Sequence, residues 1–226
     1  SDGADAVLFG PFNKASLHLA GMEEEDEHRY IARYLNFYGY HSEINMLDEL
    51  ITTRVTSHIA LRNVADALDI DGVVNAIKLA NDTLISAGTT RPRIGVAALN
   101  PHAGDDGNFG TEEIDILAPA IEKARGLQID VDGPWPSDTV FLRGRDGKLD
   151  AVVTMYHDQG QIAMKMMGFD RGVTIAAGLP VPVATPAHGT AFDIAGKGVA
   201  NLNATRKAFD ILCRMGENFR QSRMTV

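Results

Sequence analysis

Five consecutive residues, Tyr156-His157-Asp158-Gln159-Gly160, offer an imidazole, a carboxylate and an amide directly after the apolar run 149–155. An apolar run that ends in polar residues and a glycine is typical of a buried strand, and open α/β sheets bind ligands at the carboxyl ends of such strands. Lys165 follows one or two helical turns later. We therefore expect His157 to bind a divalent metal and Lys165 to bind an anionic substrate.

Two further histidines share the context of His157. His58 follows the apolar segment 51–56, and His102 follows the segment 93–99. Because the carboxyl ends of parallel strands meet at one edge of a sheet, the three imidazoles are expected to converge there as a catalytic metal site. The alternative is that each imidazole only hydrogen-bonds a loop carbonyl. Asp158 is a candidate to orient a metal ligand or to transfer a proton.

A glycine-rich segment, 188–198, is a second candidate site. Its sequence is His-Gly-Thr-Ala-Phe-Asp-Ile-Ala-Gly-Lys-Gly, and its small residues would let a ligand lie against the backbone amides. It lacks the G-x-G-x-x-G pattern of dinucleotide-binding turns. A tight turn before a helix explains the segment equally well.

The elements that must position these residues alternate between strands and helices. We expect strands at 6–9, 44–47, 51–56, 93–99, 127–131, 149–155 and 173–176, and helices at 30–35, 61–67, 73–87, 111–124, 157–167 and 205–215. Residues 133–138 are expected to form a loop and 178–180 a turn. The acidic run Glu23 to Glu27 suits the first turn of a helix, with a substrate-facing role as the alternative. This pattern predicts an α/β fold with a mainly parallel sheet.

The composition indicates a cytoplasmic globular protein. With 226 residues, 45% hydrophobic and 23% charged, the chain is long enough to bury a full core. No segment predicts a membrane span or signal peptide. The single cysteine excludes an internal disulfide, and a net charge of −9 argues against nucleic acid as a partner. Because Ser1-Asp2-Gly3 runs directly into an apolar strand, we expect an N-terminal portion to be absent.

The motifs occur in an order that closely resembles the 4-hydroxythreonine-4-phosphate dehydrogenase (PdxA) family of vitamin B6 biosynthesis. The resemblance runs from Ala6 to about Ala200 and treats residues 1–226 as a single family region, the C-terminal two-thirds of a two-lobed dehydrogenase of the isocitrate and isopropylmalate dehydrogenase type. The matching segments are Asn100-Pro101-His102-Ala103-Gly104, Gly133-Pro134, Asp138-Thr139, Tyr156-His157-Asp158-Gln159-Gly160, Lys165, Phe169 with Arg171-Gly172-Val173, Gly178-Leu179-Pro180 and His188-Gly189-Thr190-Ala191.

The resemblance implies NAD- or NADP-dependent oxidation of a hydroxy acid followed by loss of carbon dioxide, in a homodimer whose subunits share the active site. It implies a divalent metal, with zinc as the first candidate and magnesium, manganese or cobalt as alternatives. The implied metal ligands are His58, His102 and His157, one of them from the partner chain. Asp138, Asp158 and Lys165 map onto catalytic positions, Asp138 and Lys165 also onto the substrate site, and His188, Gly189, Thr190 and Ala191 onto the nucleotide site.

Three departures from the family pattern concern the substrate. Asp26-Glu27-His28-Arg29 stands where the family has Gly-His-Thr-Glu, so Glu27 and His28 become candidate substrate contacts. Thr174 replaces an asparagine, and Val183 replaces an arginine that holds the substrate. Loss of an arginine at an anion site is not conservative.

The departures leave several functions open. The substrate is 4-phosphohydroxythreonine or a relative, such as a sugar-acid phosphate or an aromatic cis-dihydrodiol carboxylate. A non-catalytic ligand-binding relative is the alternative from another functional class.

Overall fold

The computed structural model describes residues 4–48, 50–168 and 171–224. Phe169, which belongs to one of the family motifs, and Ser1 to Gly3 lie outside the described residues. No helix among the described residues is long and apolar enough to cross a bilayer.

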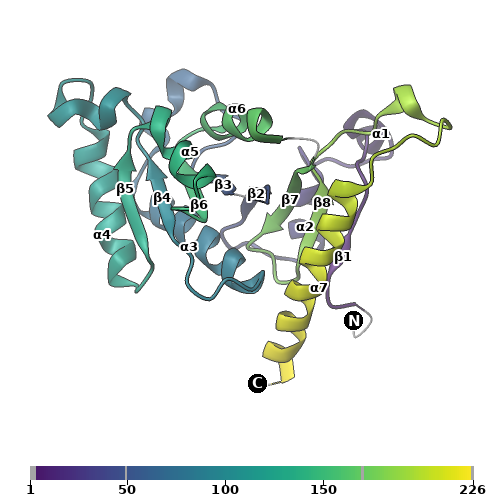
Figure 1. Cartoon of the computed structure of the whole chain (residues 1–226). Coiled ribbons are helices and arrows are strands. Elements are labelled where there is room, and N and C mark those ends of the chain that lie inside the picture. Colours follow the sequence, from purple (N-terminus) through teal and green to yellow (C-terminus); the bar gives the residue numbers. More distant parts are fainter. Residues whose placement is uncertain (1–3, 49, 169–170, 225–226) are drawn as a thin grey trace.

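In the described part of the chain, eight strands form one mixed sheet, in the order β1-β8-β7-β2-β3-β6-β4-β5 (Figure 1). Four of the seven strand pairs are parallel, namely β1–β8, β3–β6, β4–β6 and β4–β5. The predicted α/β class with a mainly parallel sheet is confirmed. The strands are β1 (Val7–Leu8), β2 (Ser42–Met46), β3 (Ile51–Arg54), β4 (Ile94–Ala97), β5 (Val131–Trp135), β6 (Ala151–Thr154), β7 (Val173–Ala177) and β8 (Val183–Pro186).

Helices cover both faces of this sheet (Figure 1). Helices α3, α4 and α7 pack on one face, and α5 and α6 pack on the other. The helices are α1 (Lys14–Leu19), α2 (Glu27–Tyr34), α3 (Ile70–Ser86), α4 (Ala118–Gly126), α5 (Ser137–Arg145), α6 (His157–Gly168) and α7 (Asn203–Met224).

The central strand β6 is apolar at every position that packs into a core, because helices cover both faces of the sheet at this strand. Ala151 and Val153 belong to the large core under α3, whereas Val152 belongs to the smaller core under α5 and α6. All three side chains are fully buried. A parallel strand covered on both faces is apolar at successive positions rather than at alternate ones, because neither face meets water.

Two helices begin at aspartates that accept backbone hydrogen bonds. Asp26 Oδ1 accepts from the Arg29 amide at 2.8 Å and starts α2, and Asp69 Oδ1 accepts from the Gly72 amide at 2.6 Å and starts α3. Each such cap contributes about 1 kcal/mol. The dipole interpretation of the acidic run is thereby supported, since Asp26 caps α2 and Glu27 lies in its first turn.

Several predicted boundaries were wrong. The strand expected at 127–131 begins at Val131 and continues through Gly133 and Pro134, which were assigned to a loop. Pro134 is tolerated because β5 is an edge strand, where a missing amide hydrogen breaks no interior ladder. Residues 137–145 form a helix that was not predicted, and neither α1 nor β8 was foreseen. The expected cap at 111–113 is absent: residues 113–117 form a π-helical turn before α4.

Candidate metal and substrate site

The three candidate histidines follow three neighbouring parallel strands. In the order β3-β6-β4, the strands end at Arg54, Thr154 and Ala97, and His58, His157 and His102 come next along the chain. All three histidines therefore follow strands whose carboxyl ends lie at the same edge of the sheet.

Two of the imidazoles lie close together. The rings of His58 and His157 have centroids 5.6 Å apart, at an interplanar angle of 48°. Each Nδ1 atom contacts a carboxylate: His58 contacts Glu25 Oε1 at 2.5 Å and His157 contacts Asp158 Oδ1 at 2.7 Å. A carboxylate on one ring nitrogen orients the imidazole and leaves the other nitrogen for a metal. The donor set therefore fits a divalent cation of the zinc class.

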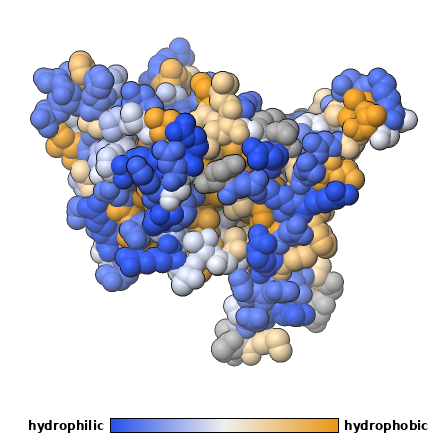
Figure 2. All heavy atoms as spheres, in the orientation of Figure 1, coloured by the Kyte–Doolittle hydropathy of each residue, from blue (hydrophilic) through white to orange (hydrophobic). Residues whose placement is uncertain are grey.

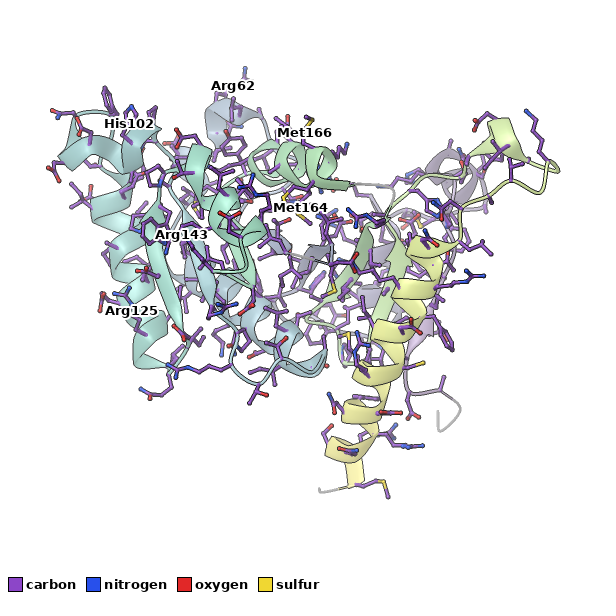
Figure 3. The ribbon with its side chains drawn as sticks, viewed as in Figure 1. Arg62, His102, Arg125, Arg143, Met164 and Met166 are labelled. Carbon is purple, nitrogen blue, oxygen red and sulfur yellow. The ribbon has the colours of Figure 1, made fainter. Side chains whose placement is uncertain are left out.

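His102 lies on a loop of unusual backbone conformation (Figure 3). Every residue from His102 to Gly107 has φ between 45° and 92°, a left-handed turn that costs about 1–2 kcal/mol per non-glycine residue. Gly104 is required here, because a Cβ atom would lie 2.8 Å from Glu113 Oε2. Within one chain the ligand atoms of His102, His58 and His157 do not all lie within 4.8 Å of one another.

Glu113 holds this loop in place and was not identified from the sequence as a site residue. Its side chain is 3% exposed, and Oε1 accepts hydrogen bonds from the amides of Leu99 and Asn100 at 2.8 and 2.7 Å. Oε2 accepts from Asn100 Nδ2 at 2.9 Å. The only sequence signal was an acidic residue expected to serve the helix dipole.

One group of acidic and histidine side chains in the described chain has metal-ligand spacing. Glu25, Asp26 and His58 each offer an atom within 4.8 Å of the others. Asp26 is already engaged by the Arg29 amide and, at 2.7 Å, by Arg29 Nη1. Arg29 Nη1 also contacts Glu25 Oε2 at 2.7 Å, but only Glu25 contacts His58 directly, through Oε1, and the acidic run before α2 was its sequence signal.

A polar cavity of about 240 Å³ lies beside His58, between the start of α2, the start of β2 and the end of β3. His28 lines this cavity and is 8% exposed. Burial lowers the pKa of His28 to about 4, with a smaller contribution from His41, whose ring centroid is 4.9 Å away. The Nε2 atom of His28 has no hydrogen-bond partner among the residues that the structure describes.

Arg54 closes the same cavity from the end of β3. It is 4% exposed, donates from Nη2 to Glu43 Oε2 at 2.5 Å, and donates from Nε to Ser57 Oγ at 2.9 Å. A buried guanidinium must be paired to offset its desolvation. Glu43, on the neighbouring strand β2, supplies that pairing.

Gln159 connects three of the elements that build the site. Its Oε1 accepts from the Met155 amide at 2.6 Å, and its Nε2 donates to the Ala98 carbonyl at 2.7 Å and to Ser137 Oγ at 2.9 Å. The ends of β6 and β4 and the start of α5 are thereby fixed together. Asp138, in the first turn of α5, is exposed at this junction.

The other predicted substrate residues have different surroundings. Lys165 and Asp158 are exposed on α6. Thr174 is half-buried on β7 with its hydroxyl 3.3 Å from Asn45 Oδ1. Glu27 lines an apolar cavity beside β1 rather than the polar cavity of His28. Val183 is fully buried in β8, so this position presents no side chain to solvent.

The predicted nucleotide segment projects from the β1–β8 end of the sheet (Figure 1). His188 Nδ1 lies 2.9 Å from the Gly189 carbonyl, and its Nε2 atom is buried with no hydrogen-bond partner in the described part of the chain. Ala191 is left-handed and precedes a short 3₁₀ helix, and nothing lies within 4 Å of the Cβ position at Gly189. An open backbone and an unsatisfied ring nitrogen fit a nucleotide contact.

Comparisons with known proteins agree with the motifs. The family described as "Pyridoxal phosphate biosynthetic protein PdxA" matches residues 1–212. A Pseudomonas aeruginosa protein with the provisional name 4-hydroxythreonine-4-phosphate dehydrogenase 2 is 59% identical over 216 residues, 95% of this chain and 64% of the relative. The D-threonate 4-phosphate dehydrogenase of Pectobacterium atrosepticum is 45% identical, over 86% of this chain and 60% of the relative. The chain thus spans less than two-thirds of these relatives.

Solved structures show the same relationship. A 4-hydroxythreonine-4-phosphate dehydrogenase from Klebsiella pneumoniae superposes with a TM-score of 0.79 and 40% identity, covering 94% of this chain and 63% of the other. A beta-decarboxylating dehydrogenase from Thermococcus kodakarensis superposes with a TM-score of 0.63 at 15% identity, covering 95% of this chain and 66% of the other. The second likeness concerns the fold alone.

Proposed function

Because the chain belongs to the PdxA family, we propose that it forms the metal-binding part of an NAD-dependent dehydrogenase that oxidises a small hydroxy acid and releases carbon dioxide. The substrate is 4-phosphohydroxythreonine or a related four-carbon acid. The observation that carries this proposal is the pair of imidazoles, His58 and His157, each oriented by a carboxylate at the carboxyl edge of the sheet.

A bound divalent cation would supply Lewis acidity at the substrate hydroxyl group, and NAD would supply a hydride acceptor. His58 and His157 would hold the cation through their Nε2 atoms, with His102 as the third ligand. Asp158 keeps the His157 ring in one orientation. Lys165, on the same helix, would hold the substrate carboxylate, and Asp138 would contact the substrate at the start of α5. His188 to Ala191 would contact the nucleotide.

Two features support a shared site in a homodimer. One chain brings only two of the three histidines together. In addition, α6 exposes apolar side chains: Ile162 is 64% exposed and Met166 is 84% exposed. Figure 2 shows apolar residues on this side of the molecule, and Figure 3 shows Met166 pointing outward from α6. A second copy packed on α6 would bury them beside Lys165 and complete the metal site.

The test is NADH formation by full-length, metal-replete protein with a panel of four-carbon hydroxy acids and their phosphates. We expect turnover with at least one of them. The variant His157→Ala should lose bound metal and reduce kcat/KM at least 100-fold, since loss of one metal ligand or its support costs 10–100-fold or more.

His18→Ala is the matched control, because His18 is exposed on α1 and, within the part of the chain that the structure describes, hydrogen-bonds only the Met22 carbonyl. It should retain both metal and activity. Unchanged metal content in His157→Ala would contradict the metal assignment. Stoichiometric metal binding without turnover of any compound would favour the alternative, a ligand-binding relative.

A further inference from the structure

A groove of about 550 Å³ lies between the β2–β3 connection and α7, and its described lining contains no histidine. Met46 and Ile211, which line it, belong to the core on the α3 and α7 face of the sheet. Helix α6, which carries His157 and Lys165, packs on the other face. Helix α7 itself runs beside β7 and β8 (Figure 1). The groove is therefore separate from the candidate metal and substrate site.

Basic side chains outnumber acidic ones in the described lining of this groove. The cationic residues are Arg171, Arg206, Lys207 and Arg214, and the carboxylates are those of Asp48 and Asp210. This local excess of positive charge occurs in a chain whose net charge is −9. Glu49 and Asp170 adjoin the lining in sequence and lie outside the described residues, so the sum of charges is less decisive than the surroundings of Arg206 and Lys207.

The positions of Arg206 and Lys207 oppose the electrostatic preference of their helix. They are the fourth and fifth residues of α7, and no acidic residue lies in its first turn. The amino end of a helix carries a partial positive charge, so cations are unfavourable there and an anion is favourable. Residues that break such a local preference occur where function requires them.

The ammonium group of Lys207 lacks a hydrogen-bond acceptor. Its Nζ atom is buried and lies 2.8 Å from Asp48 Oδ1, but at an angle that makes no hydrogen bond, and no other described residue accepts one from it. Asp48 also lies 3.6 Å from Arg171 Nη1, so one carboxylate faces two cations. Because nearly all buried polar groups are hydrogen-bonded, this ammonium at a groove wall indicates a ligand with oxygen acceptors.

Arg206 can contact the same ligand. Its side chain is exposed and makes no hydrogen bond or ion pair with the described residues. A guanidinium and an ammonium are donors only, and both bind phosphate oxygens through charge-assisted hydrogen bonds.

The size and the apolar side of the groove indicate more than a bare phosphate ion. Its volume corresponds to roughly 18 water molecules, since each occupies about 30 Å³. Met46, Leu47 and Ile211 line it with buried apolar side chains. An organic group attached to the phosphate would lie against them.

We propose that this groove is a binding site for a small organic phosphate. Lys207 and Arg206 hydrogen-bond the phosphate oxygens. The organic group packs against Met46, Leu47 and Ile211. The site does not depend on the proposed dehydrogenase activity, because none of these residues was assigned to the metal, the substrate or the nucleotide.

The probes are inorganic phosphate, phenyl phosphate and phenol, and binding to full-length, metal-loaded protein is measured by calorimetry. We expect both phosphates to bind saturably, phenyl phosphate to bind at least threefold more tightly than inorganic phosphate, and phenol not to bind. Arg206→Ala should weaken phenyl phosphate binding about tenfold, the change expected for the loss of one charge-assisted hydrogen bond. Lys207→Met should weaken it at least as much.

Arg220→Ala is the matched control, because Arg220 is exposed on the same helix and lies roughly 21 Å further along it at 1.5 Å per residue. It should bind phenyl phosphate as the wild type does. Circular dichroism shows whether each variant is folded, and the exposed Arg206 provides the test should Lys207→Met not fold.

Lys165→Ala separates this groove from the substrate site. Phenyl phosphate binding that persists in Lys165→Ala and falls in Arg206→Ala would support the proposal. Binding that falls in Lys165→Ala and is unchanged in Arg206→Ala would locate the phosphate at the substrate site and overturn it. No saturable binding of either phosphate, or phenyl phosphate binding no more tightly than inorganic phosphate, would also overturn it.

Discussion

His58 and His157 illustrate how single residues acquire a role through their neighbours. An isolated surface imidazole rotates freely, but each of these rings is held through Nδ1 by a carboxylate: His157 by its neighbour Asp158 on α6, and His58 by Glu25, which lies just before α2. The Asp158 contact could be anticipated because the two residues are adjacent in sequence. The Glu25 contact could not, because 33 residues separate it from His58 and only the tertiary fold brings α2 to the end of β3.

Glu113 accepts hydrogen bonds from the backbone just before the loop that carries His102. Glu113→Ala removes one buried acceptor and leaves the amides of Leu99 and Asn100 without their partner. We expect the free energy of unfolding to fall by about 3 kcal/mol, since each unsatisfied buried donor costs about 1–3 kcal/mol. Urea denaturation measures this loss, and metal binding should weaken as the loop around His102 loosens.

Glu112→Ala is the control for that variant. Glu112 is half-buried and contacts Asn100 Nδ2, a side-chain donor, at 2.6 Å. Removing the Glu112 carboxylate should lower the free energy of unfolding by no more than about 1 kcal/mol, because water can accept the hydrogen bond from Asn100 in its place. Similar losses for the two variants would show that Glu113 has no special role in this loop.

At the scale of elements, Asp150 connects two central strands. Its Oδ2 accepts from the Arg93 amide at 2.8 Å and from Arg93 Nε at 3.0 Å, and its Oδ1 accepts from Arg93 Nη2 at 2.7 Å. Hydrogen bonds from the Arg93 side chain hold the pKa of Asp150 below its ordinary value of 3.8. Arg93 precedes β4 and Asp150 precedes β6, so the pair fixes the register of neighbouring strands.

This lowered pKa predicts a pH dependence of stability. The unfolded chain binds a proton to Asp150 at a higher pH than the folded chain does, so the contribution of the pair is complete above pH 3.8 and disappears as pH falls through the lower folded value. Asp150→Asn should therefore be less stable than the wild type at pH 7, and this difference should shrink below about pH 4.

Urea unfolding across this pH range measures the effect, with Asp71→Asn as control. Asp71 is 77% exposed and contacts Lys123 across the surface. Such a pair contributes at most about 1 kcal/mol. A constant difference between Asp150→Asn and wild type at all pH values would contradict the assignment.

The elements themselves were predictable where one physical signal dominated. The repeat of Val73, Ile77, Ala80 and Leu84 predicted α3, because a helix on a sheet buries one stripe of its surface. Helix α5 was missed because Pro134 and Pro136 suggested a loop. Strand β8 was missed because Pro182 precedes it and Pro186 is its last residue. Short strands flanked by proline depend on sheet partners that no local pattern reveals.

At the scale of the whole molecule, the sequence predicted the sheet edge on which the histidines lie but not how many of them meet. Alternation of strands and helices is sufficient to place strand ends together. Which rings touch depends on loop conformation, and the left-handed turn at His102 has no signature beyond its glycines. The separation of Glu27 from His28 into different cavities likewise follows from the pitch of α2 in its tertiary setting.

The exposed side of α6 provides the last prediction. If a second copy packs on α6, Met166 would be buried in the interface and would contribute apolar area to it. A carboxylate at this position would weaken the dimer, because burying an unpaired charge is strongly unfavourable. Met166 is 84% exposed, so Met166→Glu should leave the monomer fold unchanged while weakening dimerisation at least tenfold in analytical ultracentrifugation.

Leu19→Glu makes an equivalent change at a residue 90% exposed on α1 and should leave the dimer intact. Because the metal site is proposed to be shared, Met166→Glu should also lose metal at concentrations where it is monomeric. A monomeric wild type, or a Met166→Glu dimer as stable as that of Leu19→Glu, would place the interface elsewhere.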